Sequence, residues 1–93
     1  MKLDERINED IGKLIDELQA LGYAVVAQEA SGMGYVVDLK GEPTLRIVCD
    51  RGQLFLHGDE KELEKYNLWR VHDSRGAFQK YLLAYINAKR KAK

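Results

Sequence analysis

The first part of the chain carries apolar side chains at the spacing of one helical stripe. Successive apolar residues are three or four positions apart, and acidic residues occupy the first turns, where negative charge suits the helix dipole. Gly22 follows the stripe and predicts the end of the helix. Gly12 inside it costs about 1 kcal/mol of helix propensity relative to Ala, and we expect this cost to be tolerated. The stripe consists of Leu3, Ile7, Ile11, Leu14, Ile15, Leu18 and Leu21.

Residues 23–57 contain four short apolar runs separated by turn sequences at residues 31–34, 41–43 and 50–53. This pattern predicts an antiparallel meander of four strands. A two-residue turn at Arg51 and Gly52 would pair Cys49 with Leu54. A three-residue loop at 41–43 would pair Leu39 with Leu45, and the two registers agree with each other.

This register divides the last three strands into two faces, because alternate residues of a strand point in opposite directions. One face is apolar and predicts the side that packs on the core. The opposite face mixes apolar and charged residues, and Asp38 and Arg46 are expected to form a cross-strand ion pair there. The core face carries Tyr35, Val37, Leu39, Leu45, Ile47, Cys49, Leu54 and Leu56, and the opposite face carries Val36, Asp38, Lys40, Arg46, Val48, Phe55 and His57.

The first strand, residues 23–30, is apolar in both alternations, so its pattern leaves two facings open. A four-residue loop at 31–34 would direct Ala24, Val26 and Gln28 inward. Tyr23, Val25 and Ala27 would then lie on the opposite face. The apolar strip of that face would extend across all four strands.

Two further helices follow the meander. Asp59 and Glu62 have the spacing of a capping box, which predicts a helix of about two turns containing Leu63 and Tyr66. Asp73 or Ser74 is expected to cap the last helix. Its apolar stripe comprises Phe78, Tyr81, Leu82, Tyr85 and Ile86.

Between these helices, residues 68–72 alternate in character, with Trp69 and Val71 on one side and Leu68, Arg70 and His72 on the other. The segment fits either a short edge strand or an extended connector. Because a tryptophan buries a large area, Trp69 is expected to close one end of the core. The competing interpretation is an exposed binding residue, since tryptophan is enriched at binding hot spots.

Together these elements predict an α+β fold of order α-β-β-β-β-α-α. The most economical arrangement is a two-layer sandwich with the N-terminal and C-terminal helices side by side on one sheet face. The 93 residues are expected to form a single α+β domain, in which residues 88–93 are a frayed basic tail. The second face of the sheet then remains uncovered.

Composition narrows the class of protein. No apolar run approaches the roughly 18 residues of a membrane span, and the N-terminus lacks an apolar stretch, so we expect a cytoplasmic protein without membrane contact. The chain has one cysteine, Cys49, which fits a reducing compartment. The formal net charge is zero, but residues 1–31 have seven acids and three bases, whereas residues 70–93 have one acid and seven bases.

No motif points to catalysis. The only histidines, His57 and His72, lack the further ligands that a zinc site needs, and we expect exposed or edge histidines. Cys49 has no base beside it in sequence and lies on the core face, which favours a buried, inert thiol. The glycine-containing loop at 31–34 joins two strands, unlike phosphate-binding loops, and Met33 should form its exposed tip. We therefore expect no enzyme, no cofactor, no metal and no small-molecule substrate.

The basic end of the last helix supports an alternative function as a nucleic-acid-binding module. The net charge of the whole chain is zero, which weighs against this interpretation, because nucleic-acid-binding domains are usually basic overall. The residues that would contact phosphates are Arg75, Lys89, Arg90, Lys91 and Lys93.

The uncovered sheet face favours a protein-protein interaction module, because exposed apolar patches with polar rims often mark interfaces. The partner would be another protein or a second copy, docking on this face or on a sheet edge. By analogy with small neutral proteins, the expected class is a bacterial or phage inhibitor, immunity or accessory protein. The predicted contact residues are Val36, Asp38, Arg46, Val48, Phe55, His57 and Trp69.

Overall fold

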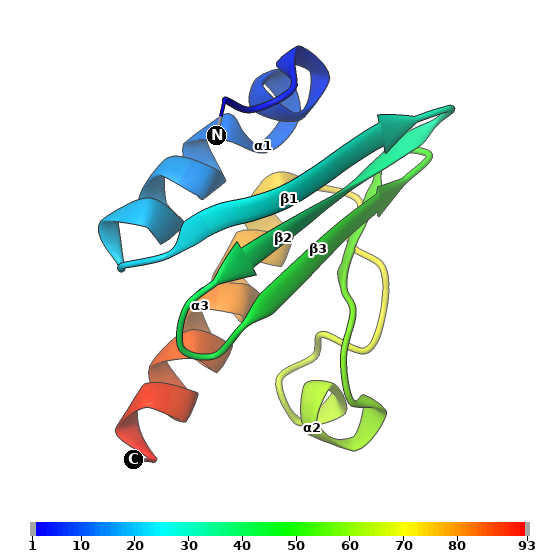
Figure 1. Cartoon of the computed structure of the whole chain (residues 1–93). Helices are drawn as coiled ribbons and strands as arrows, with labels where there is room; N and C mark the ends of the chain where they lie inside the picture. The colour runs from blue at the N-terminus through cyan, green and yellow to red at the C-terminus, as the bar shows by residue number, and fades with distance from the viewer. Residues whose placement is uncertain (1, 93) are drawn as a thin grey trace.

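The computed structural model describes residues 2–92 and has the predicted order of elements (Figure 1). Helix α1 spans Glu5–Ala20 and leads into strands β1 (Ala24–Ser31), β2 (Gly34–Lys40), β3 (Leu45–Asp50) and β4 (Gln53–Leu56). Helices α2 (Glu60–Lys65) and α3 (Arg75–Lys91) complete the chain. The strands form one antiparallel sheet in the order β1-β2-β3-β4, so the predicted α+β meander is confirmed.

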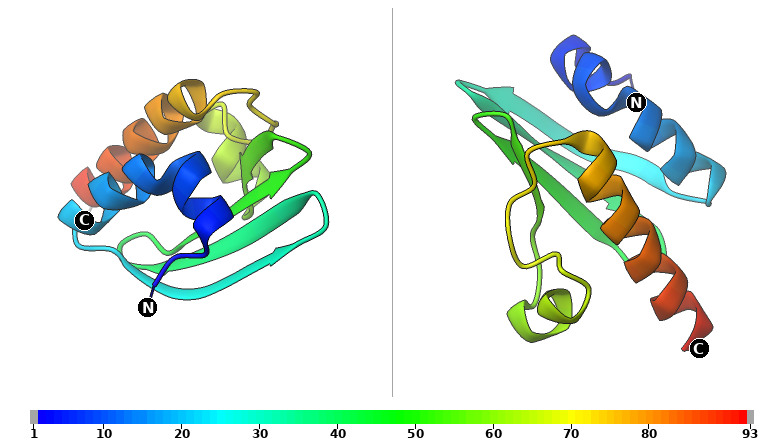
Figure 2. Two further views of the ribbon diagram at one scale, coloured as in Figure 1. Left: turned by 90° about the horizontal axis from the view of Figure 1, so that it is seen from above. Right: turned by 180° about the vertical axis from the view of Figure 1, so that it is seen from behind.

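Helices α1 and α3 lie on the same side of the sheet, and the two views in Figure 2 show both of them there. The short helix α2 lies beyond the end of β4 (Figure 1). None of the helices within residues 2–92 combines the length and apolar character that a bilayer crossing requires.

The predicted register of the last three strands is confirmed. Cys49 pairs with both Tyr35 and Leu54, and Leu39 pairs with Leu45. The eight residues of the predicted core face are all buried, together with most residues of the two helical stripes. The exceptions are Leu21, which is exposed, and Leu3 and Tyr81, which are half-buried. Burial of these side chains is the main stabilising contribution, since each apolar side chain removed from water contributes about 1.5–3 kcal/mol.

The predicted facing of the first strand was wrong over its first half. Tyr23 is buried and Val25 packs against the core, whereas Ala24 and Val26 are exposed. Gln28 points toward the helices as predicted, because it hydrogen-bonds to the segment before α1. The first half of β1 is therefore inverted relative to the expected alternation.

A bulge at Val26 is the cause of this inversion. Val25 pairs with Leu39 and Ala27 pairs with Asp38, so β1 advances by two positions while β2 advances by one. Val26 is the extra residue, and an extra residue shifts the alternation by one position. The predicted four-residue loop at 31–34 indicated the right register for residues 27–30 but could not reveal the bulge. The loop is shorter than predicted, because Ser31 pairs with Gly34.

Local sequence signals set the helix ends. Gly22 has a φ of +99°, which favours glycine directly after α1. The Asp59 carboxylate accepts a hydrogen bond from the Glu62 N–H at 3.0 Å and caps α2. Ser74, rather than Asp73, caps α3 by accepting from the backbone N–H of residue 77.

Residues 67–73 form an extended connector and not an edge strand. Its one bridge to the sheet joins His72 to Leu54 through two backbone hydrogen bonds of 2.7 and 2.8 Å. The alternation predicted for this segment holds for the buried residues Leu68 and His72 and for the exposed residues Trp69 and Val71. It was wrong for Arg70, which is exposed although it was predicted on the side of Leu68. His72 lies at the sheet edge as expected, but it is buried, since its ring packs beside those of Phe78 and Tyr81.

The expected frayed tail at residues 88–93 is drawn as helix as far as Lys91. Helix α3 continues to Lys91, and the side chains of Lys89 and Arg90 are half-buried against other elements. These contacts hold the last turn in place. Lys93 lies outside the described residues.

Candidate functional site

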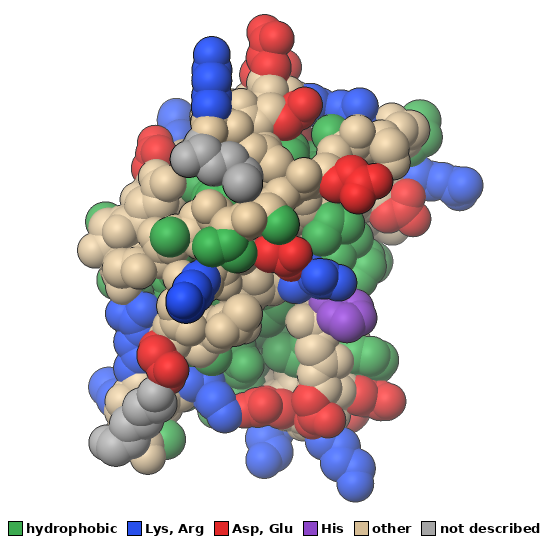
Figure 3. Space-filling model, viewed as in Figure 1, with side chains coloured by type: hydrophobic (Ala, Val, Ile, Leu, Met, Phe, Trp, Pro, Cys, Tyr) green, Lys and Arg blue, Asp and Glu red, His purple; other side chains and the backbone are tan. Residues whose placement is uncertain are grey.

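The sheet face away from α1 and α3, called the open face below, carries six of the seven predicted contact residues. Figure 3 views the molecule from this side, where hydrophobic side chains gather around a histidine between acidic and basic side chains. The apolar members are half-buried rather than buried, because no element within residues 2–92 covers them. The six residues are Val36, Asp38, Arg46, Val48, Phe55 and His57.

Three shallow hollows adjoin one another along the open face. The first lies over the Asp38 and Arg46 side chains and is bounded by Val36. Val36 also lines the second hollow together with Val48 and Phe55. Phe55 in turn lines the third, so the predicted residues form one continuous strip rather than separate patches.

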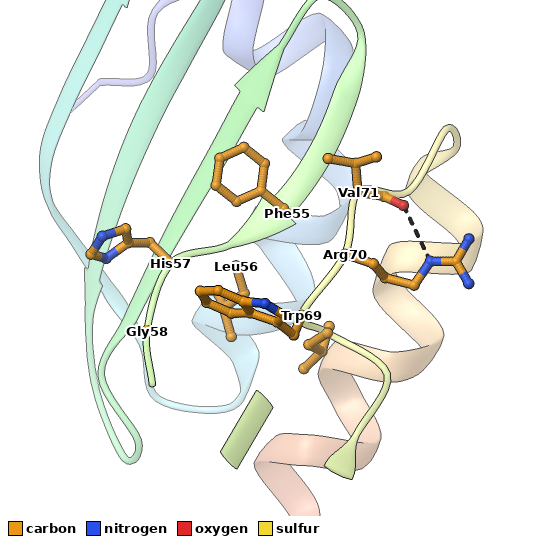
Figure 4. Close-up of a pocket in the computed structure, with 8 residues that line it drawn as sticks. Phe55, Leu56, His57, Gly58, Trp69, Arg70 and Val71 are labelled. Carbon is orange, nitrogen blue, oxygen red and sulfur yellow. Dashed lines mark hydrogen bonds between the residues drawn. The ribbon is translucent and has the colours of Figure 1, made fainter. Parts of the chain in front are cut away.

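The third hollow is a groove of about 280 Å³ between the end of β4 and the connector. In Figure 4 the rings of Phe55 and Trp69 lie one above the other, with His57 beside them on the β4 side. The Arg70 side chain points away from these rings, and its Nε donates to the Val71 carbonyl at 3.4 Å. The groove is therefore lined mainly by apolar groups and opens beside the strip.

Trp69 does not close the core as expected. Its side chain is 47% exposed, whereas the neighbouring Leu68 is fully buried and occupies the core position. Leu68 is held at the end of α2, where its backbone N–H donates to the Leu63 carbonyl at 2.9 Å, and the chain bends outward at the next two residues. Trp69 thus joins the predicted contact residues in the groove.

Val71 was not predicted as a contact residue, although it lines the groove and is 43% exposed. The signal that could have found it is the alternation of residues 68–72, which places Val71 on the same side as Trp69. Two large apolar side chains exposed at such a spacing are unusual for a connector that only links two helices.

Two opposite charges on the open face, those of Asp38 and Arg46, neutralise each other. The Arg46 Nε donates to Asp38 Oδ1 at 2.7 Å, and a second contact from Arg46 Nη2 to Asp38 Oδ2 measures 3.2 Å. The hydrogen bond from Arg46 to Asp38 raises the pKa of the guanidinium. The predicted ion pair is confirmed, and its two charges compensate each other at one end of the strip.

No protein-family model, curated protein or solved structure matches this chain.

The basic end of α3 is partly engaged inside the molecule. Lys89 pairs with Glu62 of α2, and the hydrogen bond that it donates to this carboxylate raises the pKa of Lys89. Arg90 donates to the Glu42 carbonyl at 2.7 Å and lies over the Tyr23 ring. Among the described candidates for phosphate contact, Arg75 and Lys91 are exposed.

The buried thiol lies on the core face beside a carboxylate. The Asp10 Oδ2 accepts a hydrogen bond from the Tyr35 hydroxyl at 2.7 Å and lies 3.9 Å from the Cys49 Sγ. Burial raises the pKa of Cys49 and that of Tyr35, so both groups stay protonated at neutral pH. A protonated, buried thiol is a poor nucleophile.

The two histidines lie in different surroundings. His57 is exposed beside the groove, and its backbone N–H donates to the Arg46 carbonyl. The His72 Nε2 lies 3.0 Å from the Asn67 carbonyl inside the connector. Within residues 2–92, no three His, Cys, Asp or Glu side chains converge as a metal site would require.

Proposed function

We propose that this protein is a small, non-enzymatic interaction module that docks another protein on its open face and the adjoining groove. The observation that carries the proposal is the continuous strip from Val36 through Phe55 to Trp69. Its apolar side chains contribute little to the core, and exposing them to water has no evident benefit for the isolated chain. We place its action in the cytoplasm, as an inhibitor, immunity or accessory protein of a bacterium or phage.

The anatomy of the strip supports a protein partner. Interfaces typically combine an apolar centre containing aromatic residues with a polar rim. Phe55 and Trp69 supply aromatic anchors at one end, and the Asp38–Arg46 pair and His57 supply the rim. A neutralised ion pair at the rim can be approached without leaving a buried charge unpaired.

The internal contacts of α3 favour a protein partner over a nucleic acid. Lys89 and Arg90 are held by Glu62 and by the Glu42 carbonyl, so contact with phosphates would require these contacts to break. The alternative predicts retention on heparin that weakens steeply as salt rises. Absence of retention at low salt would exclude it.

The decisive experiment compares matched variants in affinity capture from native lysate. Val48→Glu combined with Phe55→Glu places two charges on the strip and should remove the partners captured by the unaltered protein. The control, Gln19→Glu combined with Ala84→Glu, places the same two charges on exposed positions of α1 and α3 and should retain them. A nuclease-treated sample identifies partners held through nucleic acid.

Folding of the strip variant is checked by circular dichroism and urea unfolding. If the double variant does not fold, Trp69→Ala tests the same surface, because the exposed indole can be removed with little effect on the core. Sedimentation velocity of the same proteins reports self-association through the strip. Unchanged capture and unchanged sedimentation by a folded strip variant would refute the proposal.

A further inference from the structure

Helix α1 is divided in two by a residue that is not helical. Ile11 has φ −129° and ψ 18°, whereas helices require values near −63° and −42°. Gly12 follows at once, and glycine is the weakest helix former after proline. Residues 2–10, called the N-terminal arm below, are therefore attached to the rest of α1 through a joint with little helical preference.

The arm is held to the β1–β2 hairpin mainly by polar contacts. Arg6 Nη1 donates to the carbonyls of Gly32 and Gly34 at 2.9 and 3.3 Å. The Gln28 side chain donates to the Lys2 carbonyl at 2.6 Å and accepts from the backbone N–H of residue 4 at 2.7 Å. These contacts can exchange for water when the arm moves.

The apolar anchoring of the arm is weaker than that of the remaining helix. Ile7 is buried and Leu3 is half-buried, and these are the arm's two large apolar side chains. After the joint, Ile11 and the three following stripe residues are all fully buried, namely Leu14, Ile15 and Leu18. The arm is thus held to the sheet mainly by polar contacts, whereas the rest of α1 is held by buried apolar side chains.

The last residue of the arm closes over one end of the core. The Asp10 carboxylate accepts the hydrogen bond from Tyr35 and approaches the Cys49 sulfur, and both of these core residues are only 4% exposed. Asp16 on the far side of the joint is exposed, as Asp10 is, but within residues 2–92 it makes no such contact with the core. Movement of the arm would therefore uncover Tyr35 and Cys49.

We propose that the N-terminal arm is a hinged lid, which opens about Ile11 and Gly12 while the sheet and α3 remain folded. The contact between Asp10 and Tyr35 is its latch. Segments with few buried apolar contacts and exposed hydrogen bonds open at lower free energy than the global core. This device is independent of the partner surface, which lies on the other face of the sheet.

The test uses the reactivity of Cys49, the one cysteine of the chain, toward iodoacetamide at increasing urea concentrations. Opening of the lid exposes less surface than global unfolding does. We therefore expect the labelling rate to depend less steeply on urea than the unfolding equilibrium does. Asp10→Ala should raise the rate in water by roughly tenfold, the effect of losing one hydrogen bond to a charged group. Tyr35→Phe should act similarly, and the double variant should add little more.

Asp16→Ala is the matched control, since it removes an exposed carboxylate from the same helix and should change the rate by less than about twofold. Hydrogen exchange gives a second readout, in which amides of residues 6–10 exchange faster in Asp10→Ala while those of α3 do not. Equal urea dependence of labelling and global unfolding would overturn the lid. An Asp16→Ala rate as high as that of Asp10→Ala would overturn the latch.

Discussion

The two faces of strands β2 and β3 are built from alternate residues of the same segments, yet they differ in what covers them. On the helix side, Val37 and Ile47 are fully buried. On the open face, their neighbours Val36 and Val48 pair across the same two strands but remain half-buried. An antiparallel sheet with one solvated face normally alternates apolar and polar residues. The open face departs from that rule where its valines and Phe55 lie.

The two faces of one strand therefore differ in what they contribute to the protein. The helix side contributes to stability, because α1 and α3 remove its side chains from water. The apolar residues of the open face have no such cover, so stability alone does not account for them. Substitutions on the two faces should therefore affect different measurements.

The largest contrast is expected between the adjacent residues Ile47 and Val48. Ile47→Ala should lower the free energy of unfolding by about 2–5 kcal/mol, since it leaves a cavity in the core. Val48→Ala should lower it by less than about 1 kcal/mol, because its side chain is already partly hydrated. Urea unfolding monitored by circular dichroism measures both. Similar losses would mean that the open face is packed as tightly as the core.

The connector offers a second adjacent pair of the same kind. Leu68→Ala should cost about 2–4 kcal/mol, whereas Trp69→Ala should change the free energy of unfolding by less than about 1 kcal/mol. The indole is the one tryptophan of the chain, so its fluorescence reports the groove directly. Its emission in the free protein should lie toward that of hydrated tryptophan and shift to the blue when a partner covers the groove. A buried-type emission in the free protein would contradict the exposure of Trp69.

Alkaline pH should lower the free energy of unfolding through two groups on the helix side of the sheet, Tyr35 and Cys49. Burial, with a smaller contribution from Asp10, raises the pKa of Tyr35 above its ordinary value of 10.0, and burial raises that of Cys49 above 9.0. Because the folded pKa values exceed the unfolded ones, the folded state holds more protons above about pH 9. The free energy of unfolding should therefore be constant near neutrality and fall as pH rises through 9 and 10.

Urea unfolding between neutral and strongly alkaline pH measures this dependence. Tyr35→Phe removes one titrating hydroxyl from the core and should give a shallower decline. A decline of the same steepness in this variant would show that Tyr35 contributes nothing to it.

The smallest effect is expected at the ion pair on the open face. Asp38→Asn removes the carboxylate that faces Arg46, but both side chains are partly exposed and water replaces the lost contact. The change in stability should be minor and should vanish in high salt, which screens exposed charges. A large loss that persists in high salt would show that the open face contributes to stability after all. Arg46→Gln removes the other charge of the same ion pair and should have an equally minor effect.

Most of the sheet register was predictable from short-range signals. The turns at Arg51–Gly52 and at residues 41–43 each specified one pairing, and agreement between them left a single consistent alternation. The candidate site followed from that alternation. Its contact residues could be predicted because sheet faces are a period-two property of the chain.

Other features depended on contacts between distant segments. The position of Trp69 beside β4 depends on how the connector packs on the sheet, where a bridge joins His72 to Leu54, a residue far away in sequence. Lys89 and Arg90 looked like a free basic tail, because their partners belong to α2 and to the β2–β3 loop. A pattern of charges along a helix carries no information about which acceptors fold against it.

The sequence by itself determined the order of elements, the helix ends and the two faces of β2, β3 and β4, because these follow from local periodicity, caps and turns. Only the tertiary structure decided the facing of β1, where both alternations are apolar and a bulge at Val26 changes the phase midway. It also decided which apolar residues remain outside. The open face and the groove exist because α1 and α3 cover only one side of the sheet. Which side they cover depends on the packing of the whole chain and not on any single segment.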